Sequence, residues 1–270
     1  MPIIQANGIK IYYELHGQGE PLVLISGLTE DHTAWENVLE KLAQSFRVLI
    51  FDNRGAGQST SPKTSFTIGD MAKDTVALLQ ALDIPKAHIL GHSMGGAIAQ
   101  QIAIENPERV LKLIIACSAA KLSPLSMFVV KTGEKLVDAQ VSYELLIENV
   151  FPWLFSSDFL ADDKKVAKAF ERKIKNPHPQ TLEGYKNQIR ACGQFDTTTQ
   201  LSKIKTQTLV LTTEQDILIS PRHSKMLTEN INGAKLVMLP NIGHIPQLEN
   251  PTLFCQEVVR FLGVSKGLKS

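Results

Sequence analysis

A glycine-flanked serine, the motif Gly-His-Ser-Met-Gly at residues 91–95, is the feature that most restricts how this chain can fold. The apolar run 87–90 precedes it, and the helix-forming run 97–103 follows it. This order predicts a strand, a sharp turn and a helix, with Ser93 at the turn. Only residues without a β-carbon at the two glycine positions let strand and helix approach so closely. The alternative is a glycine-rich turn whose serine has no chemical role.

Strand and helix patterns alternate on both sides of this motif. Buried-strand patterns occur at 9–14, 21–25, 47–51, 87–90, 110–116, 208–212 and 234–239. Helical spacing of apolar residues occurs at 35–46, 68–82, 97–103, 221–230 and 251–262. Such alternation predicts an α/β fold, in which a mostly parallel central sheet is covered by helices on both faces.

The pattern changes near Ala120, and no convincing buried strand occurs from there to about Phe195. Helical patches take its place at 127–137, 143–150, 161–173 and 181–191. We therefore expect an α/β core of residues 1–120 and 196–270, with a helical lid insertion at 121–195. Ligands of such sheets bind at the carboxyl ends of the strands, where this lid is expected to lie.

Composition excludes several classes of partner. With 270 residues, 43% of them hydrophobic, and a net charge of +1, the chain has no electrostatic footprint for nucleic acid or an anionic membrane. No secretory signal and no apolar run of about 18 residues are visible, so we expect a cytoplasmic protein. The cysteines Cys117, Cys192 and Cys255 are too widely spaced to form a disulfide framework or a zinc site. We expect no cofactor and no metal.

A serine nucleophile needs a base, and the base needs an orienting carboxylate. In a fold with this turn, the chain order is serine, acid, histidine. Asp216 and His244 each follow the carboxyl end of a predicted strand, at the sheet edge that presents Ser93. We predict Ser93, Asp216 and His244 as the catalytic residues.

Other histidines and carboxylates compete for these two roles. His92 is expected to pack or to line the pocket, and His88 lies within a strand. The remaining histidines are His16 and His178 in turns, His32 in a loop and His223 in a helix. The alternative acids are Glu214 and Asp196.

The chemistry also requires an oxyanion hole, which is a pair of N–H groups directed at the developing negative oxygen. One donor is expected to be the N–H of Met94, the residue after the serine. The other is expected from the loop after the strand 21–25, and Leu28 is our choice.

Together these segments resemble the α/β-hydrolase superfamily. The resemblance rests on the segments 24–28, 51–59 and 91–96, on Asp216 and on Gly243-His244. The chain looks most similar to small lidded serine hydrolases such as 3-oxoadipate enol-lactonases and carboxylesterases that act on pimeloyl esters. Two positions depart from the family pattern: Ser26 stands where most members have His, and Thr213 stands where many have Gly.

The segment 52–59, Asp-Asn-Arg-Gly-Ala-Gly-Gln-Ser, suggests a phosphate-binding loop. It lacks the Lys-Ser/Thr ending of a P-loop and the glycine spacing of a dinucleotide fingerprint. We therefore expect a structural turn, locked by Asp52 and Arg54.

Substrate choice is expected to lie in the lid. Its apolar candidates are Met127, Phe128, Phe151, Trp153, Leu154, Phe155 and Phe159, which alternatively only pack the lid onto the core. Trp153 is our single choice for the substrate pocket. Four cations of the lid are the alternative contacts for a substrate carboxylate, but charges on helices are more typical of a solvated face; these are Lys131, Lys135, Arg172 and Arg190.

These features favour hydrolysis of a small carboxylic ester or lactone through an acyl-enzyme. One alternative keeps the same three residues and lets hydrogen peroxide intercept the acyl-enzyme, as in cofactor-free haloperoxidases. The other is a receptor-like protein that binds a ligand and turns it over slowly. Epoxide hydrolases and haloalkane dehalogenases are disfavoured, because they have an aspartate where Ser93 stands. The sequence leaves the acyl group, the leaving group and the oligomeric state open.

Overall fold

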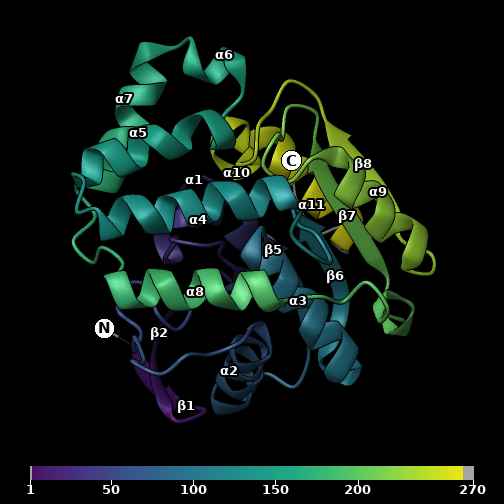
Figure 1. Ribbon diagram of the computed structural model, residues 1–270. Coiled ribbons are helices and arrows are strands. Elements are labelled where there is room, and N and C mark those ends of the chain that lie inside the picture. The colour runs from purple at the N-terminus through teal and green to yellow at the C-terminus, as the bar shows by residue number, and fades with distance from the viewer. Residues whose placement is uncertain (1, 264–270) are drawn as a thin grey trace.

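The computed structural model describes residues 2–263 and contains one eight-stranded sheet (Figure 1). The strands are β1 (Ile3–Ala6), β2 (Ile9–His16), β3 (Glu20–Ile25), β4 (Phe46–Phe51), β5 (Ala87–His92), β6 (Val110–Ala116), β7 (Thr208–Thr213) and β8 (Lys235–Leu239). Their order across the sheet is β1-β2-β4-β3-β5-β6-β7-β8. From β4 to β8 in this order, neighbouring strands are parallel. Strand β2 is antiparallel to both of its neighbours, β1 and β4. The mostly parallel sheet predicted from the alternating pattern is confirmed.

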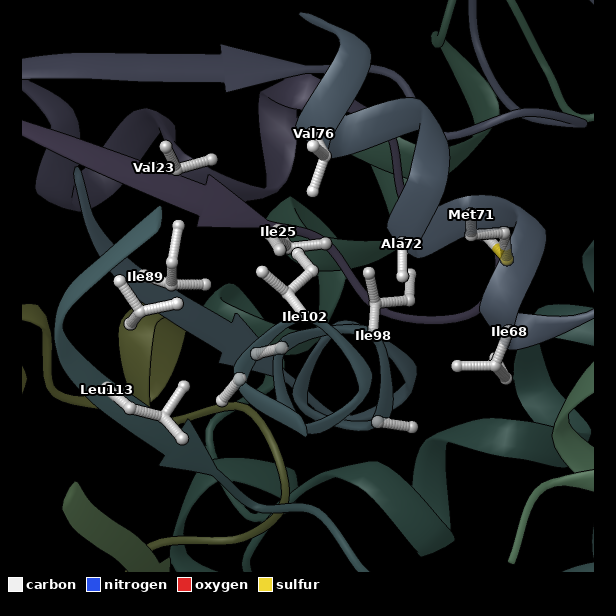
Figure 2. Close-up of a cluster of buried hydrophobic side chains, with 14 of the residues drawn as sticks. Val23, Ile25, Ile68, Met71, Ala72, Val76, Ile89, Ile98, Ile102 and Leu113 are labelled. Carbon is white, nitrogen blue, oxygen red and sulfur yellow. The ribbon is translucent and has the colours of Figure 1, made fainter. Parts of the chain in front are cut away.

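Helices cover both faces of this sheet. Helices α1 (Glu36–Ala43) and α11 (Pro251–Leu262) pack on one face, and α2 (Ile68–Ala81), α3 (Met94–Glu105) and α9 (Pro221–Asn230) pack on the other. Strand β3 shows why both faces are apolar: Leu22 and Leu24 point to the first group of helices, while Val23 and Ile25 point to the second. Figure 2 shows Val23 and Ile25 in this second layer, beside side chains of α2 and α3.

The insertion between β6 and β7 is entirely helical. It comprises α4 (Pro124–Asp138), α5 (Tyr143–Leu154), α6 (Ser157–Leu160), α7 (Asp163–Ile174) and α8 (Leu182–Gln194). Each helix begins after a Ser, Thr or Asp whose side chain accepts a hydrogen bond from a free N–H of the first turn. Figure 1 shows α4 and α8 running side by side, with α5, α6 and α7 above them.

Short elements were the ones that the sequence patterns did not reveal. These are β1, the helices α6 and α10 (Pro246–Glu249), and the 3-10 turns η1 (His32–Trp35), η2 (Pro107–Arg109) and η3 (Leu201–Lys203). Three or four residues are too few to establish a periodic pattern. None of the helices within residues 2–263 has both the length and the apolar character that crossing a lipid bilayer requires.

Candidate active site

Ser93 occupies the turn between β5 and α3, as the sequence predicts. Its backbone has φ 54° and ψ −119°, a conformation that residues other than glycine rarely adopt. Its N–H donates to the Ala116 carbonyl of β6 at 2.9 Å, which fastens the turn to the neighbouring strand. Strain of this kind persists only where the surroundings hold it. The turn therefore presents the Ser93 hydroxyl at the carboxyl edge of the sheet.

The glycines around Ser93 are required by close backbone contacts. A β-carbon at Gly91 would lie 2.0 Å from the Gly95 carbonyl oxygen, and one at Gly95 would lie 2.0 Å from the Ile25 carbonyl oxygen. A β-carbon at Gly96 would lie 2.5 Å from that of Ser118. Strand and helix thus approach as closely as the motif predicts.

The structure brings Ser93, His244 and Asp216 together from three segments of the chain. His244 Nε2 lies 2.9 Å from Ser93 Oγ, and His244 Nδ1 lies 2.7 Å from Asp216 Oδ2. The carboxylate accepts, so Nδ1 carries the proton and Nε2 is left as the acceptor for the hydroxyl. The second oxygen, Asp216 Oδ1, accepts from the N–H of Ile219 at 2.8 Å and keeps the carboxylate in place. This arrangement can deprotonate a serine hydroxyl and stabilise the resulting imidazolium.

His92 supports the loop after β8 that carries Gly243 and His244, which we call the histidine loop. Its Nε2–H donates to the His244 carbonyl at 2.8 Å, and its side chain is buried. Burial, reinforced by the nearby charge of His244, lowers the pKa of His92 to about 3. A neutral His92 therefore adds no positive charge beside His244. The sequence placed His92 near the site but gave no sign of this contact.

Glu249 fixes the same loop and was not found from the sequence. Its carboxylate accepts from the Gly243 N–H at 3.0 Å and from the N–H and Oγ–H of Ser156 at 3.2 and 2.5 Å. Burial raises the pKa of Glu249, although these three hydrogen bonds oppose the shift. Since Ser156 precedes α6, Glu249 joins the His244 loop to the helical insertion. Only contacts between distant segments reveal this role.

Thr213 and Ser26, the two departures from the family pattern, both make buried hydrogen bonds. The hydroxyl of Thr213 donates to the Gly243 carbonyl at 2.6 Å and so links β7 to the histidine loop. The hydroxyl of Ser26 donates to the Asp31 carbonyl at 3.0 Å and accepts from the Trp35 indole at 2.9 Å. Each hydroxyl therefore stabilises a loop beside the site.

Leu28 and Met94, the predicted oxyanion donors, both line the cavity at Ser93. Within residues 2–263, neither N–H donates a hydrogen bond to another part of the chain. A free N–H is expected for Met94, because it lies in the first turn of α3. Both N–H groups are thus available to a substrate oxygen.

Three of the alternative bases and both alternative acids have partners elsewhere. His32 pairs with Asp52, His16 with Glu14 and His88 with Glu20. Asp196 pairs with Lys121, and Glu214 accepts from the N–H of Asn241.

The turn at 52–59 is structural, but its two charged residues act separately. Asp52 accepts from the N–H groups of His32 and Gln58, and it fills the space beside Gly57. Arg54 also holds the turn, but with a different partner from those of Asp52. It forms a two-pronged ion pair with Asp74 and so fastens the turn to α2.

A cavity of about 350 Å³ lies between Ser93 and the helical insertion, a volume suited to a small organic substrate. Its apolar wall includes Leu122, Val129, Val130, Leu146, Ile147, Val150, Phe151, Leu154, Phe155 and Phe195. Trp153, the predicted pocket residue, is not part of this wall. Phe151, Leu154 and Phe155 share one face of the chain at helical spacing, and Trp153 falls between them on another face.

Charged side chains occur in this cavity at one place only among the described residues, where Glu30, Arg172 and Lys173 meet. Arg172 also donates to the Thr33 carbonyl at 3.0 Å, so its guanidinium is already paired. Lys131, Lys135 and Arg190, the other candidate cations, are exposed to solvent.

Two groups of possible metal ligands occur within residues 2–263. They are His92 with Cys117 and His244, and Asp31 with His32 and Asp52. In the first, both His244 nitrogens are occupied by Ser93 and Asp216. In the second, the carboxylates already accept from neighbouring N–H groups. Protein hydrogen bonds thus explain both groups.

The fold and the serine turn define the class of this protein. The chain matches the family described as alpha/beta hydrolase fold over residues 20–251, and it belongs to that family.

Relatives within the family span nearly the whole chain. RutD of Azorhizobium caulinodans, provisionally named a carbamate hydrolase, is 26% identical over 97% of this chain and 98% of its own. 3-Oxoadipate enol-lactonase 2 of Acinetobacter baylyi is 27% identical over 93% of this chain and 92% of its own. The crystal structure of the enol-lactonase from Burkholderia xenovorans has a TM-score of 0.88 at 27% identity, covering 97% of this chain and 99% of that one.

Proposed function

We propose that this protein hydrolyses small carboxylic esters or lactones through an acyl-enzyme. The observation that carries the proposal is the hydrogen-bonded series Ser93–His244–Asp216, with links of 2.9 and 2.7 Å, beneath an apolar cavity of about 350 Å³. In this proposal the core comprises residues 1–120 and 196–270, and residues 121–195 act as the lid that encloses the acyl group.

The reaction begins with attack of Ser93 Oγ on the substrate carbonyl carbon while its proton passes to His244 Nε2. The N–H groups of Leu28 and Met94 hold the oxyanion, and Asp216 stabilises the imidazolium. His244 then gives the proton to the leaving alkoxide, and an ester on Ser93 remains; the alcohol of an ester departs, whereas that of a lactone stays attached to the acyl group. Water gives a proton to His244 and attacks the acyl carbon; the bond to Ser93 Oγ then breaks as His244 returns the proton to Oγ, and the acid is released.

The apolar wall of the cavity favours substrates whose acyl group has several carbons. Removing apolar surface from water contributes roughly 25 cal/mol per Å² to binding, so an alkyl chain or ring gains affinity from this cavity. The enol-lactonase relatives support the lactone branch of the proposal. A carbamate would undergo the same attack, and for that reason it belongs in the substrate panel.

The test is turnover of p-nitrophenyl esters of increasing acyl length, alongside lactones and aryl carbamates. We expect a burst equal to one product per enzyme, and a loss of kcat of at least about 10⁴-fold in Ser93→Ala. Wild-type inertness on the whole panel would overturn the proposal. If only carbamates are turned over, the proposed substrate would be a carbamate and not an ester or lactone. Halide oxidation that depends on acetate and peroxide would instead support perhydrolysis.

A further inference from the structure

The turn Gly27–Glu30 carries Leu28 and has a strained backbone. The Glu30 N–H donates to the Gly27 carbonyl at 3.3 Å, and Thr29 has φ +66°. A threonine at positive φ is unfavourable, because its branched side chain crowds the backbone there. Such a conformation persists only when other contacts hold it. The position of the Leu28 N–H therefore depends on whatever holds Thr29 and Glu30.

Those contacts come from the helical insertion. The Glu30 carboxylate accepts from Lys173 Nζ and from Arg172 Nη2, the latter at 3.3 Å, and both cations lie at the end of α7. The Thr29 N–H donates to Gln188 Oε1 of α8 at 3.4 Å. Both strained-turn residues are thus bound by side chains more than 140 positions later in the chain.

The partners of this turn are themselves held in place. Gln188 Oε1 also accepts from Gln180 Nε2 at 2.8 Å, and Gln188 Nε2 donates to the Arg54 carbonyl at 3.0 Å. The Glu30 side chain is only 11% exposed. Although burial opposes ionisation, the charges of Lys173 and Arg172 lower the pKa of Glu30 to about 2. Glu30 therefore remains an anion near neutral pH.

We propose that Lys173, Arg172 and Gln188 are positioning residues for the oxyanion hole, acting on the Leu28 N–H through Glu30 and Thr29. This inference rests on the proposed ester hydrolysis. It assigns the cavity's cations to the protein's own carboxylate rather than to an acidic substrate. The insertion then shapes the transition state as well as enclosing the acyl chain.

An oxyanion donor acts on the transition state, so its displacement lowers kcat more than it raises KM. Loss of one donor costs about 10²–10³-fold in kcat, and a displaced donor is expected to cost about 10- to 100-fold. A residue that binds substrate directly would instead raise KM. The ratio of these two effects separates the roles.

The variants for the test are Lys173→Met, Glu30→Gln and Gln188→Leu, each measured with a p-nitrophenyl ester. Lys186→Met is the matched control, because Lys186 pairs with Asp138 inside the insertion and makes no contact with the turn. Lys173→Arg keeps the charge and is the conservative rescue. Thermal unfolding by circular dichroism identifies any of the three test variants that fails to fold, and the remaining variants then test the inference.

A trifluoromethyl ketone gives the second readout, because Ser93 adds to it and places an oxyanion in the hole. Its methyl ketone analogue measures binding without the oxyanion. We expect each variant to lose 10- to 100-fold in kcat and in trifluoromethyl ketone affinity, with KM and methyl ketone affinity changed less than about twofold. Lys173→Arg and Lys186→Met should stay near wild type.

The inference is overturned if kcat falls no further than in Lys186→Met, or if KM rises while kcat is kept. Equal losses for both ketones would also overturn it. Failure of the proposed function looks different, because wild type would then show neither a burst nor labelling of Ser93 by a fluorophosphonate.

Discussion

The sheet core and the helical insertion bury their side chains to very different extents. All six residues of β5 and all six of β7 are buried, whereas α4 buries only Ser126 among 15 residues and α7 only Ala169 among 12. The other apolar side chains of α4 and α7 are only partly buried or are exposed. The core is therefore stabilised by its own packing, and the insertion depends on a small apolar cluster and on polar links to the core. We therefore expect the core to hold Ser93, His244 and Asp216 in place, and the insertion to set the substrate fit and to support the turn that carries Leu28.

The largest expected effect breaks the core site itself. Asp216→Asn should lower kcat about 10⁴-fold, because the amide favours the wrong tautomer of His244 and cannot stabilise the imidazolium charge that forms during the reaction. Stability should change little, since the side-chain shape and the acceptor for the Ile219 N–H are kept. Single-turnover ester hydrolysis measures the effect. A loss below about tenfold would mean that another carboxylate serves His244.

Core packing should be the next largest effect. Leu24 is fully buried between β3 and the α1–α11 layer. Leu24→Ala should lower the free energy of unfolding by about 3 kcal/mol, the sum of lost transfer energy and a cavity. Urea unfolding measures it, and the acyl-length profile should remain that of wild type. A changed profile would show that the core also sets substrate fit.

Acidic pH should weaken the core through His92. Because its folded pKa of about 3 lies below the ordinary 6.5, neutral His92 stabilises the fold above pH 6.5, and this stability is lost as the pH falls toward 3. His92→Gln keeps a donor for the His244 carbonyl but does not titrate. Wild type should lose stability more steeply than His92→Gln between pH 6 and 4, by up to about 1.4 kcal/mol per pH unit.

Unfolding curves across this pH range test the difference. His178→Gln is the control, because His178 is exposed and should leave the wild-type slope unchanged. Parallel slopes for wild type and His92→Gln would mean that His92 is not the group responsible.

The smallest stability effect is expected in the insertion, together with a clear change in specificity. Leu146 lines the cavity and is only partly buried, so Leu146→Ala should cost less than about 1 kcal/mol. The enlarged cavity should shift the preferred ester toward a longer acyl chain. Its neighbour Leu145 is 46% exposed and lies outside the wall, which makes Leu145→Ala the control. Identical acyl-length profiles for Leu146→Ala and Leu145→Ala would contradict the expectation that the insertion sets the substrate fit.

Most of the core followed from local patterns in the sequence. The strand–turn–helix order around Ser93, the seven longer strands and the positions of Asp216 and His244 after their strands were all predicted, and the structure places them together. These features depend on apolar alternation and on glycine sterics, which act over a few residues. The insertion was predicted as helical for the same reason.

The facing of the insertion helices could not be predicted in the same way. An amphipathic helix turns by about 100° per residue, so a pattern shows that a face exists but not what it contacts. Trp153 illustrates the difficulty, because a large aromatic residue beside pocket residues proved to lie outside the wall. Arg172 shows it for charge, since its partner Glu30 lies 142 positions away.

Local patterns along the chain were therefore enough to predict the fold class, the exposed serine, and the two residues that follow strands and meet it. Contacts between distant segments were needed to show that His92 and Glu249 support the histidine loop, and that Lys173 and Gln188 reach the turn carrying Leu28. The difference comes from the range over which the interactions act. Local sterics and periodicity are set by adjacent residues, whereas a buried hydrogen bond between distant segments exists only after the packing of helices on the sheet has fixed both ends.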